Sequence, residues 1–263
     1  MIIDYAAQVD IGKKEANDDR ALVDGIIVDS NYIEGTVDVP AVVAVCDGCG
    51  GYQGGNIAAE LVLDTLRKES PPLLTDTSYL SHVLSQCQQL VLEKKREMPT
   101  YSDMCTTVAG CIFTESSIIV FHSGDSRVYR CDEWGIAKMT RDHSIVQDMI
   151  DMGEILPEDA LHHPKRNVIS RCIGIDGPSP EIYVSNTPIY PGEKYVLCSD
   201  GLWEAVDEKL IKEALDKSCS LKETADNLVQ LALKNGSEDN ISIIICSREG
   251  SLAHDDSEPY ILD

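Results

Sequence analysis

The chain has 263 residues, of which 43% are hydrophobic, and a formal net charge of -23 from 45 acidic and 22 basic residues. This charge argues against nucleic acid as a partner, because a binder must neutralise phosphates with Lys and Arg. No apolar run approaches the roughly 18 residues of a membrane helix, and residues 1–5 lack the basic and apolar segments of a secretory signal. The ten cysteines have no regular spacing, which is typical of reduced cytosolic proteins. We therefore expect a cytoplasmic protein, a monomer, with no membrane partner.

The N-terminal part of the chain predicts strands followed by two long helices. Short apolar runs predict strands at 5–9, 20–28 and 42–46, and the polar stretch 29–40 indicates a surface loop. Apolar residues at a helical period predict helices over 55–69 and 76–95, and Asp76 or Thr77 is the expected cap of the second helix.

From residue 106 onwards the apolar period changes to that of strands. Strands are predicted at 107–113, 117–122 and 127–131, with a short return strand after a turn at 132–135. The polar stretch 142–175 contains one short predicted helix at 144–152, and we expect it to be a mobile flap. Strands at 194–199 and 241–246 and helices at 207–217 and 221–234 complete the predicted elements.

The order of these elements predicts an α+β fold. Long helices that alternate with groups of neighbouring strands favour helices packed over a mostly antiparallel core. The chain shows no internal repeat and no linker-like change in composition, so we expect a single domain over residues 1–249. Residues 250–263 have no periodicity and are expected to form a tail.

The most informative stretch is the apolar run 42–46 and the Asp47-Gly48 pair that follows it. A carboxylate at the end of a buried strand, beside glycines whose backbone carbonyls can approach a ligand, is typical of half a site for Mg²⁺ or Mn²⁺. Taken alone, however, an Asp-Gly pair more often marks a plain β-turn.

The same feature recurs elsewhere in the chain, and this recurrence favours the metal site over the turn. Acidic residues flanked by Gly or Asn are expected at strand edges at Asp18-Asp19, Asp47, Asp125, Asp200 and Asp239. Gathered carboxylates repel one another unless divalent cations neutralise them, and such cations accept a ligand set made only of oxygens. The six histidines do not repeat at ligand spacing, so a His-based zinc site is not expected.

Some chemically suggestive residues have competing interpretations. Cys46 and Cys49 form a C-x-x-C pattern, which indicates a redox site in other contexts, but a glycine turn is not the helix start that such a site requires. His143 is interpreted as a structural hydrogen-bonding partner rather than a catalytic group, and His162-His163 as part of the flap surface.

Eight ordered blocks of the sequence resemble the metal-dependent serine/threonine protein phosphatases of the type 2C family, nearer to its bacterial branch. The blocks are Asn17-Asp18-Asp19, Asp47-Gly48-x-Gly50-Gly51, Cys105-Thr106-Thr107, Gly124-Asp125-Ser126-Arg127, Asp142-His143-Ser144, His163-Pro164-x-Arg166-Asn167-Val168-Ile169, Ser199-Asp200-Gly201-Leu202 and Asp239-Asn240. They span nearly the whole chain, and an ordered set of this kind is far more specific than any one of its members.

The resemblance implies a fold and an activity. The expected fold is a two-sheet antiparallel β-sandwich with helices on both outer faces, a four-layer αββα arrangement with the metals at one end. The expected reaction is the hydrolysis of phosphoserine and phosphothreonine in phosphorylated proteins, the products of serine/threonine kinases, by a hydroxide that bridges two divalent cations. A catalytically weak module of the same fold that binds phosphoproteins is the alternative.

The resemblance also implies roles for single residues around two tightly bound Mn²⁺ or Mg²⁺ ions. Asp47 would bridge both ions, and the Gly48 carbonyl would bind the second. Asp200 and Asp239 would complete the shell of the first ion. Asp18, where the family usually has Glu, would reach the second ion through water.

Three further roles follow from the same resemblance. Asp125, with Asp200, would hold a third and weaker ion. Lys14 stands where the family usually has an Arg that binds the substrate phosphate, so Lys14 and Asp47 are the expected catalytic residues; the spacing leaves Lys13 as a substitute, or both lysines as solvated side chains. Cys49 stands where the eukaryotic branch has a His that is a candidate general acid, so water is the expected proton donor.

Overall fold

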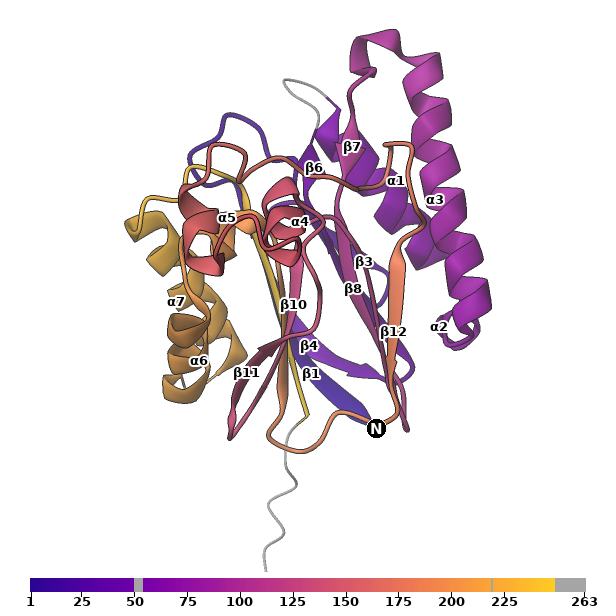
Figure 1. Cartoon of the computed structure of the whole chain (residues 1–263). Helices are drawn as coiled ribbons and strands as arrows, with labels where there is room; N and C mark the ends of the chain where they lie inside the picture. The colour runs from indigo at the N-terminus through magenta and orange to yellow at the C-terminus, as the bar shows by residue number, and fades with distance from the viewer. Residues whose placement is uncertain (50–53, 219, 249–263) are drawn as a thin grey trace, which may run out of the picture.

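The computed structural model describes residues 1–49, 54–218 and 220–248, and two antiparallel sheets packed face to face form its centre (Figure 1). One sheet contains, in spatial order, β11 (Gly135–Lys138), β10 (Arg127–Asp132), β13 (Lys194–Cys198), β14 (Ile241–Ser247), β1 (Ile2–Asp10) and β4 (Asn31–Asp38). The other contains β12 (Glu181–Ser185), β9 (Ile118–Ser123), β8 (Val108–Phe113), β5 (Ala41–Cys46), β2 (Arg20–Val23) and β3 (Ile26–Val28). A small ladder joins β6 (Gly48–Cys49) to β7 (Cys105–Thr106).

Helices cover the outer face of each sheet and produce four layers. On one side lie α1 (Gly55–Lys68), the short α2 (Pro71–Leu74) and α3 (Thr77–Glu97), and on the other lie α5 (Asp200–Trp203), α6 (Glu208–Lys217) and α7 (Leu221–Lys234) (Figure 1). The carboxylate of Asp76 accepts hydrogen bonds from the backbone of Ser78 and Tyr79, which confirms it as the cap of α3. The expected four-layer αββα sandwich is confirmed.

Strand β5 shows why the central strands are apolar along their whole length. Val43 and Val45 point into the cluster between the two sheets, whereas Val42, Ala44 and Cys46 point into the cluster beneath α1 and α3. Successive side chains of a strand point to opposite faces, so a strand that is covered on both faces has no polar position. This packing fixes the end of β5, where Asp47 follows.

Two expectations from the sequence are wrong in detail. The segment 29–40 is not a loop, because it contains β4, which pairs with β1 at the edge of its sheet. Only Val37 of β4 is buried, so the strand carries almost no apolar signal. The predicted strand 20–28 is a hairpin of β2 and β3, and its turn places Asp24 and Gly25 at positive φ. Strand β12 and helix α5 were also not expected.

The segment 142–175 lies over one end of the sandwich and includes α4 (Ile145–Asp151) and the 3₁₀ turn Pro157–His162 (Figure 1). Its two ends are held by isolated bridges, one between Ser144 and Ile169 and one between Thr106 and Ile173. Whether this segment moves as a flap remains a prediction. The expected tail at 250–263, and Gly50 and Gly51, lie outside the described residues. Within the described ranges, no helix is both long enough and apolar enough to span a bilayer.

Candidate metal centre

Four of the predicted metal ligands come together at one end of the sandwich, from both sheets. Asp47 follows β5, Asp125 lies in the turn between β9 and β10, Asp200 begins α5, and Asp239 precedes β14. Burial raises the pKa of Asp47 well above its ordinary value, and the nearby carboxylates, that of Asp200 first, raise it further. The fold therefore brings like charges together around Asp47, whose burial limits screening by water.

Asp125 and Asp200 show what this cluster lacks. The Oδ1 atoms of both are buried, and no hydrogen-bond donor in the described part of the chain reaches either. Burial raises the pKa of Asp125 to about 8, with Asp200 adding to the effect, and burial together with Asp239 raises that of Asp200 to about 6. Buried oxygens without partners are costly, and a divalent cation with oxygen ligands removes both that cost and the repulsion. The donor set fits Mn²⁺ or Mg²⁺.

Gly48 provides the backbone approach that a carbonyl ligand requires. A Cβ at this position would lie 2.2 Å from the carbonyl carbon of Gly55, at the start of α1, so no other residue fits without a backbone shift. The preceding peptide is fixed by Thr107, whose Oγ1 accepts from the Asp47 N–H at 3.0 Å and whose own N–H donates to the Asp47 carbonyl at 2.9 Å. The turn after β5 is therefore rigid on both sides.

The turn that carries Asp125 is supported by His143. The Gly124 N–H donates to His143 Nδ1 at 3.1 Å, and the His143 N–H donates back to the Gly124 carbonyl at 2.9 Å. Gly124 has φ +119°, and a Cβ there would lie 2.6 Å from Thr107, so both the conformation and the contact require glycine. His143 thus holds in place the turn that carries Asp125.

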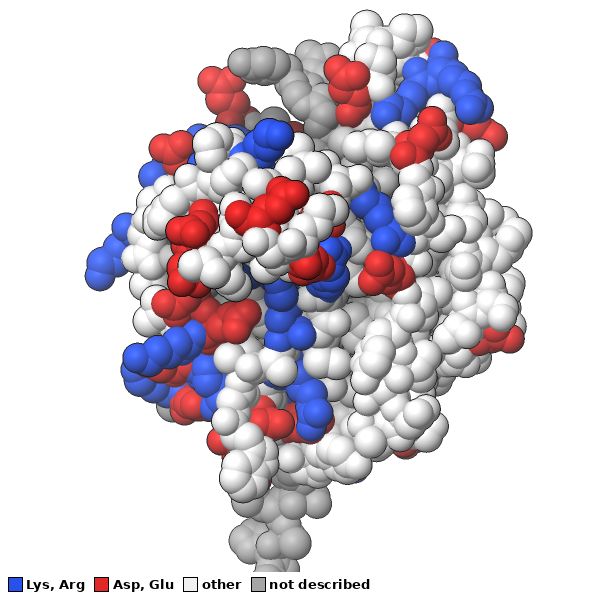
Figure 2. All heavy atoms as spheres, viewed as in Figure 1, with Lys and Arg blue, Asp and Glu red and all other residues white. Residues whose placement is uncertain are grey.

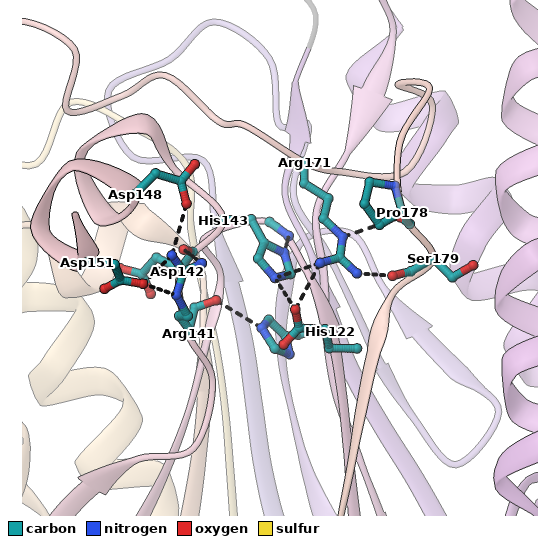
Figure 3. Close-up of polar contacts among 11 residues, drawn as sticks. His122, Arg141, Asp142, His143, Asp148, Asp151, Arg171, Pro178 and Ser179 are labelled. Carbon is teal, nitrogen blue, oxygen red and sulfur yellow. Dashed lines mark hydrogen bonds and ion pairs between the residues drawn. The ribbon is translucent and has the colours of Figure 1, made fainter.

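His143 is itself held in the neutral form. Burial lowers its pKa to about 4, with His122 and Arg171 adding to the effect. Because Nδ1 accepts from Gly124, the ring proton is on Nε2, which donates to Glu181 Oε1 at 3.3 Å. The ring stacks on His122 with 4.6 Å between centroids, and Arg171 reaches in from the segment above (Figure 3). The interpretation of His143 as a structural partner agrees with these contacts.

Asp19 is buried in the structure, although the sequence analysis assigned a separate role only to its neighbour Asp18. Asp19 Oδ2 accepts from Ser199 Oγ at 2.7 Å, and burial raises the pKa of Asp19 to about 7, with Asp200 and Asp239 adding to it. Asp18 Oδ1 instead accepts from the Asn56 N–H at 2.9 Å, in the first turn of α1. Asp19 immediately precedes Arg20, the first residue of β2. A carboxylate at the start of a strand was the sequence feature that could have indicated a place for Asp19 in the cluster.

Lys14 lies at the margin of the carboxylate cluster. Its Nζ is 3.0 Å from Asp239 Oδ1, and both side chains are about half exposed. A cavity of about 810 Å³ opens here, lined by Lys13, Lys14, Arg166, Asn167, Asp200, Glu204 and Asp239 among others. Arg166, from the segment 142–175, was not among the expected site residues. On the face shown in Figure 2, charged side chains gather over this segment and α6, and the surface over β12 is largely uncharged.

Comparisons with known proteins identify the family of this chain. A family model for protein phosphatase 2C matches residues 10–148. The serine/threonine phosphatase stp of Listeria welshimeri is 33% identical over 218 residues, which cover 80% of this chain and 86% of the relative.

Solved structures give the same result. The crystal structure of the Mycobacterium tuberculosis serine/threonine phosphatase PstP/Ppp has a TM-score of 0.81 at 28% identity, covering 95% of this chain and 100% of that one. The catalytic domain of PstP in complex with two manganese ions has a TM-score of 0.78 at 26% identity, covering 95% of this chain and 99% of that one. The resemblance carried by the eight blocks is confirmed, and the chain belongs to the protein phosphatase 2C family.

Proposed function

We propose that this chain removes phosphate from phosphoserine and phosphothreonine in proteins, using two divalent cations held at the end of the sandwich. The observation that carries the proposal is the set of converging carboxylates, in which Asp125 and Asp200 each keep a buried oxygen without a partner. Such an arrangement is unfavourable in a purely structural site and becomes favourable when cations bind. The two manganese ions of the similar PstP domain support the choice of metal.

We assign the ligands as follows. Asp47 and the Gly48 carbonyl, with Asp200 and Asp239, hold the two tight ions, and Asp125 holds a third, weaker ion with Asp200. Asp18 acts through water, and Asp19 keeps Ser199 and the start of α5 in place through its hydrogen bond. When bound, Mn²⁺ or Mg²⁺ ions supply an activated water as nucleophile and offset charge on the phosphoryl oxygens.

The substrate phosphate is assigned to Lys14. In the structure this ammonium group is paired with Asp239, so a cation that binds Asp239 competes with Lys14 for the carboxylate. Lys14 is then available to a phosphate oxygen in the adjacent cavity. His143 has both ring nitrogens engaged, and Cys49 faces another thiol, so we assign protonation of the leaving alkoxide to water.

The remaining parts of the proposal concern the setting of the reaction. The substrates are phosphorylated products of serine/threonine kinases, and the protein acts as a monomer in the cytoplasm. Mg²⁺ replaces Mn²⁺ where it is the more abundant ion.

The test is hydrolysis of an aryl phosphate and of a phosphothreonine peptide by the purified chain. We expect turnover with Mn²⁺ or Mg²⁺, none with excess chelator, and recovery when metal is restored. Asp47→Asn is the matched control, because it keeps the shape of the side chain and removes its charge. Equal turnover in chelator, or in Asp47→Asn at saturating Mn²⁺, would refute the proposal.

A further inference from the structure

Three thiols converge beside the Asp47-Gly48 turn. Cys49 of β6 lies directly opposite Cys105 of β7, and Cys172 precedes Ile173, which bridges to Thr106 of β7. The three Sγ atoms all lie within 4.8 Å of one another, and those of Cys49 and Cys105 are 3.0 Å apart. The three backbone segments are far apart in the sequence, so the fold itself creates the cluster.

The other described cysteines have a different role. Of the nine that the structure describes, six pack within the three apolar clusters, and the three that belong to none of these clusters are Cys49, Cys105 and Cys172. Cys46, the other half of the C-x-x-C pattern, packs in the cluster beneath α1 and α3. The thiols at 49, 105 and 172 are therefore not explained by apolar packing.

The cluster is accessible from one side only. Cys105 and Cys172 are 7% and 4% exposed, whereas Cys49 is partly exposed. Hydrogen bonds that join the Cys105 sulfur to those of Cys172 and Cys49 hold the pKa of Cys105 below its ordinary value, with Lys95 adding to this effect. One sulfur is thus favoured as a thiolate, which is the form that binds metal ions.

The spacing of the sulfurs suits one tetrahedral ion. A Zn–S bond is about 2.3 Å, so two sulfurs bound to the same tetrahedral ion are about 3.8 Å apart. The observed pair at 3.0 Å and the limit of 4.8 Å bracket this value. Small side-chain rotations therefore suffice to place three thiolates around a common centre.

We propose that Cys49, Cys105 and Cys172 form a binding site for a soft divalent cation such as Zn²⁺. Within the described ranges no fourth His, Cys or carboxylate joins the three, which leaves one position of a tetrahedral ion to a further ligand such as water. Thiolates select soft ions, and the nearby carboxylates select hard ones, so the two sites differ in metal preference. An ion here ties β6, which carries Gly48, to β7 and to the end of the segment 142–175.

The first test uses the reduced, metal-free, full-length chain and Cd²⁺ as a probe, because a cadmium–thiolate bond gives a charge-transfer absorption that oxygen ligands do not give. We expect one equivalent of Cd²⁺ to produce this band and Zn²⁺ to remove it by competition. Cys49→Ser, Cys105→Ser and Cys172→Ser should each weaken it strongly. Cys87→Ser, at a cysteine of the apolar cluster beneath α1 and α3, and Asp239→Asn should retain it. A band that survives Cys105→Ser, or no band in the reduced chain, would overturn the proposal.

The second test needs no variant, so it does not depend on how the substitutions fold. X-ray absorption at the zinc edge, with one equivalent of Zn²⁺ and excess Mn²⁺, should show three sulfur neighbours at about 2.3 Å. An all-oxygen shell would place the zinc at the carboxylates and overturn the proposal. A Cys49–Cys105 disulfide found by mass spectrometry in the same zinc-loaded sample would also overturn it, in favour of a redox pair.

Discussion

Lys14 and Asp239 form an ion pair, with 3.0 Å between Nζ and Oδ1, at the edge of the carboxylate cluster. Burial alone lowers the pKa of Lys14, but its hydrogen bond to Asp239 and the charges of Asp200 and Asp47 outweigh this, so its pKa is raised. Because both side chains are about half exposed, the pair adds little to stability. The contact matters because it joins the expected phosphate ligand to an expected metal ligand.

This relationship makes Lys14 the first residue to test. Lys14→Ala should raise KM for a phosphopeptide and lower kcat, because a lost charge-assisted contact is worth roughly 1.5 to 3 kcal/mol, or about ten- to a hundredfold in kcat/KM. Lys14→Arg should keep most of the activity, since a guanidinium can hold two phosphate oxygens. Steady-state kinetics at saturating Mn²⁺ measures both.

Lys13→Ala is the matched control, because Lys13 also lines the cavity, and the structure gives it no ion pair among the described residues. It should change kcat/KM little. If Lys13→Ala is damaging and Lys14→Ala is silent, the phosphate contact belongs to Lys13.

Asp47→Ala should abolish turnover and leave the fold intact. Burial raises the pKa of Asp47, and the nearby carboxylates of Asp200, Asp19, Asp125 and Asp239 raise it further. Removing Asp47 therefore relieves repulsion in the metal-free state. We expect a Tm in chelator at or above that of the unmodified chain, and almost no rise in Tm when Mn²⁺ is added. Scanning calorimetry with and without Mn²⁺ measures this. A normal Mn²⁺-induced rise would show that the tight ions do not need Asp47.

The sequence was sufficient to predict that Asp47, Asp125, Asp200 and Asp239 lie together, because each stands next to Gly or Asn close to the end or the start of an apolar strand. Their roles as metal ligands remain a prediction. It was not sufficient for Asp19, whose buried carboxylate accepts a hydrogen bond from Ser199, 180 positions away along the chain. The thiol cluster was missed for the same reason. The C-x-x-C pattern pairs Cys46 with Cys49 by position, whereas the ladder of β6 and β7 places Cys49 opposite Cys105.

The strands show the same limit of the sequence, which reports burial along a strand but not its pairing with distant segments. Strands covered on both faces, such as β5 and β8, are continuous apolar runs and were predicted nearly to the residue. The edge strands β4 and β12 are held mainly by backbone pairing to β1 and β9, and their largely exposed side chains give no periodic signal. Pairing partners distant in the sequence are a property of the tertiary structure.

Asp125→Ala should separate the third ion from the tight pair. Asp125 lies in the turn that His143 supports, apart from the elements that carry Asp200 and Asp239. Titration calorimetry should still show two tight Mn²⁺ sites, while kcat falls strongly because the weaker ion is lost. If the tight sites disappear as well, Asp125 is a ligand of the primary pair.

The last prediction concerns pH. Burial raises the pKa of Asp19 from 3.8 to about 7 and that of Asp125 from 3.8 to about 8, so the metal-free folded chain keeps protons that the unfolded chain has released. Stability in chelator should therefore fall as pH rises from about 4 to 8, by about 1.4 kcal/mol per pH unit for each proton retained. The buried His143, with its pKa lowered to about 4, acts in the opposite direction only below its ordinary value of 6.5.

Above pH 6.5 His143 no longer contributes, and Cys105, whose pKa is lowered, acts alike in any variant that keeps it. Comparison of the unmodified chain with a carboxylate variant between pH 6.5 and 8.5 therefore isolates the carboxylates. We expect Tm in chelator to be lower at pH 8.5 than at pH 6.5, and the rise in Tm caused by Mn²⁺ to be larger at pH 8.5, because the ion binds the ionised form. The double variant Asp19→Asn/Asp125→Asn should flatten the pH dependence in chelator, since an amide does not titrate. A pH dependence in chelator that is the same in this double variant as in the unmodified chain would show that these carboxyl groups are already ionised in the metal-free fold.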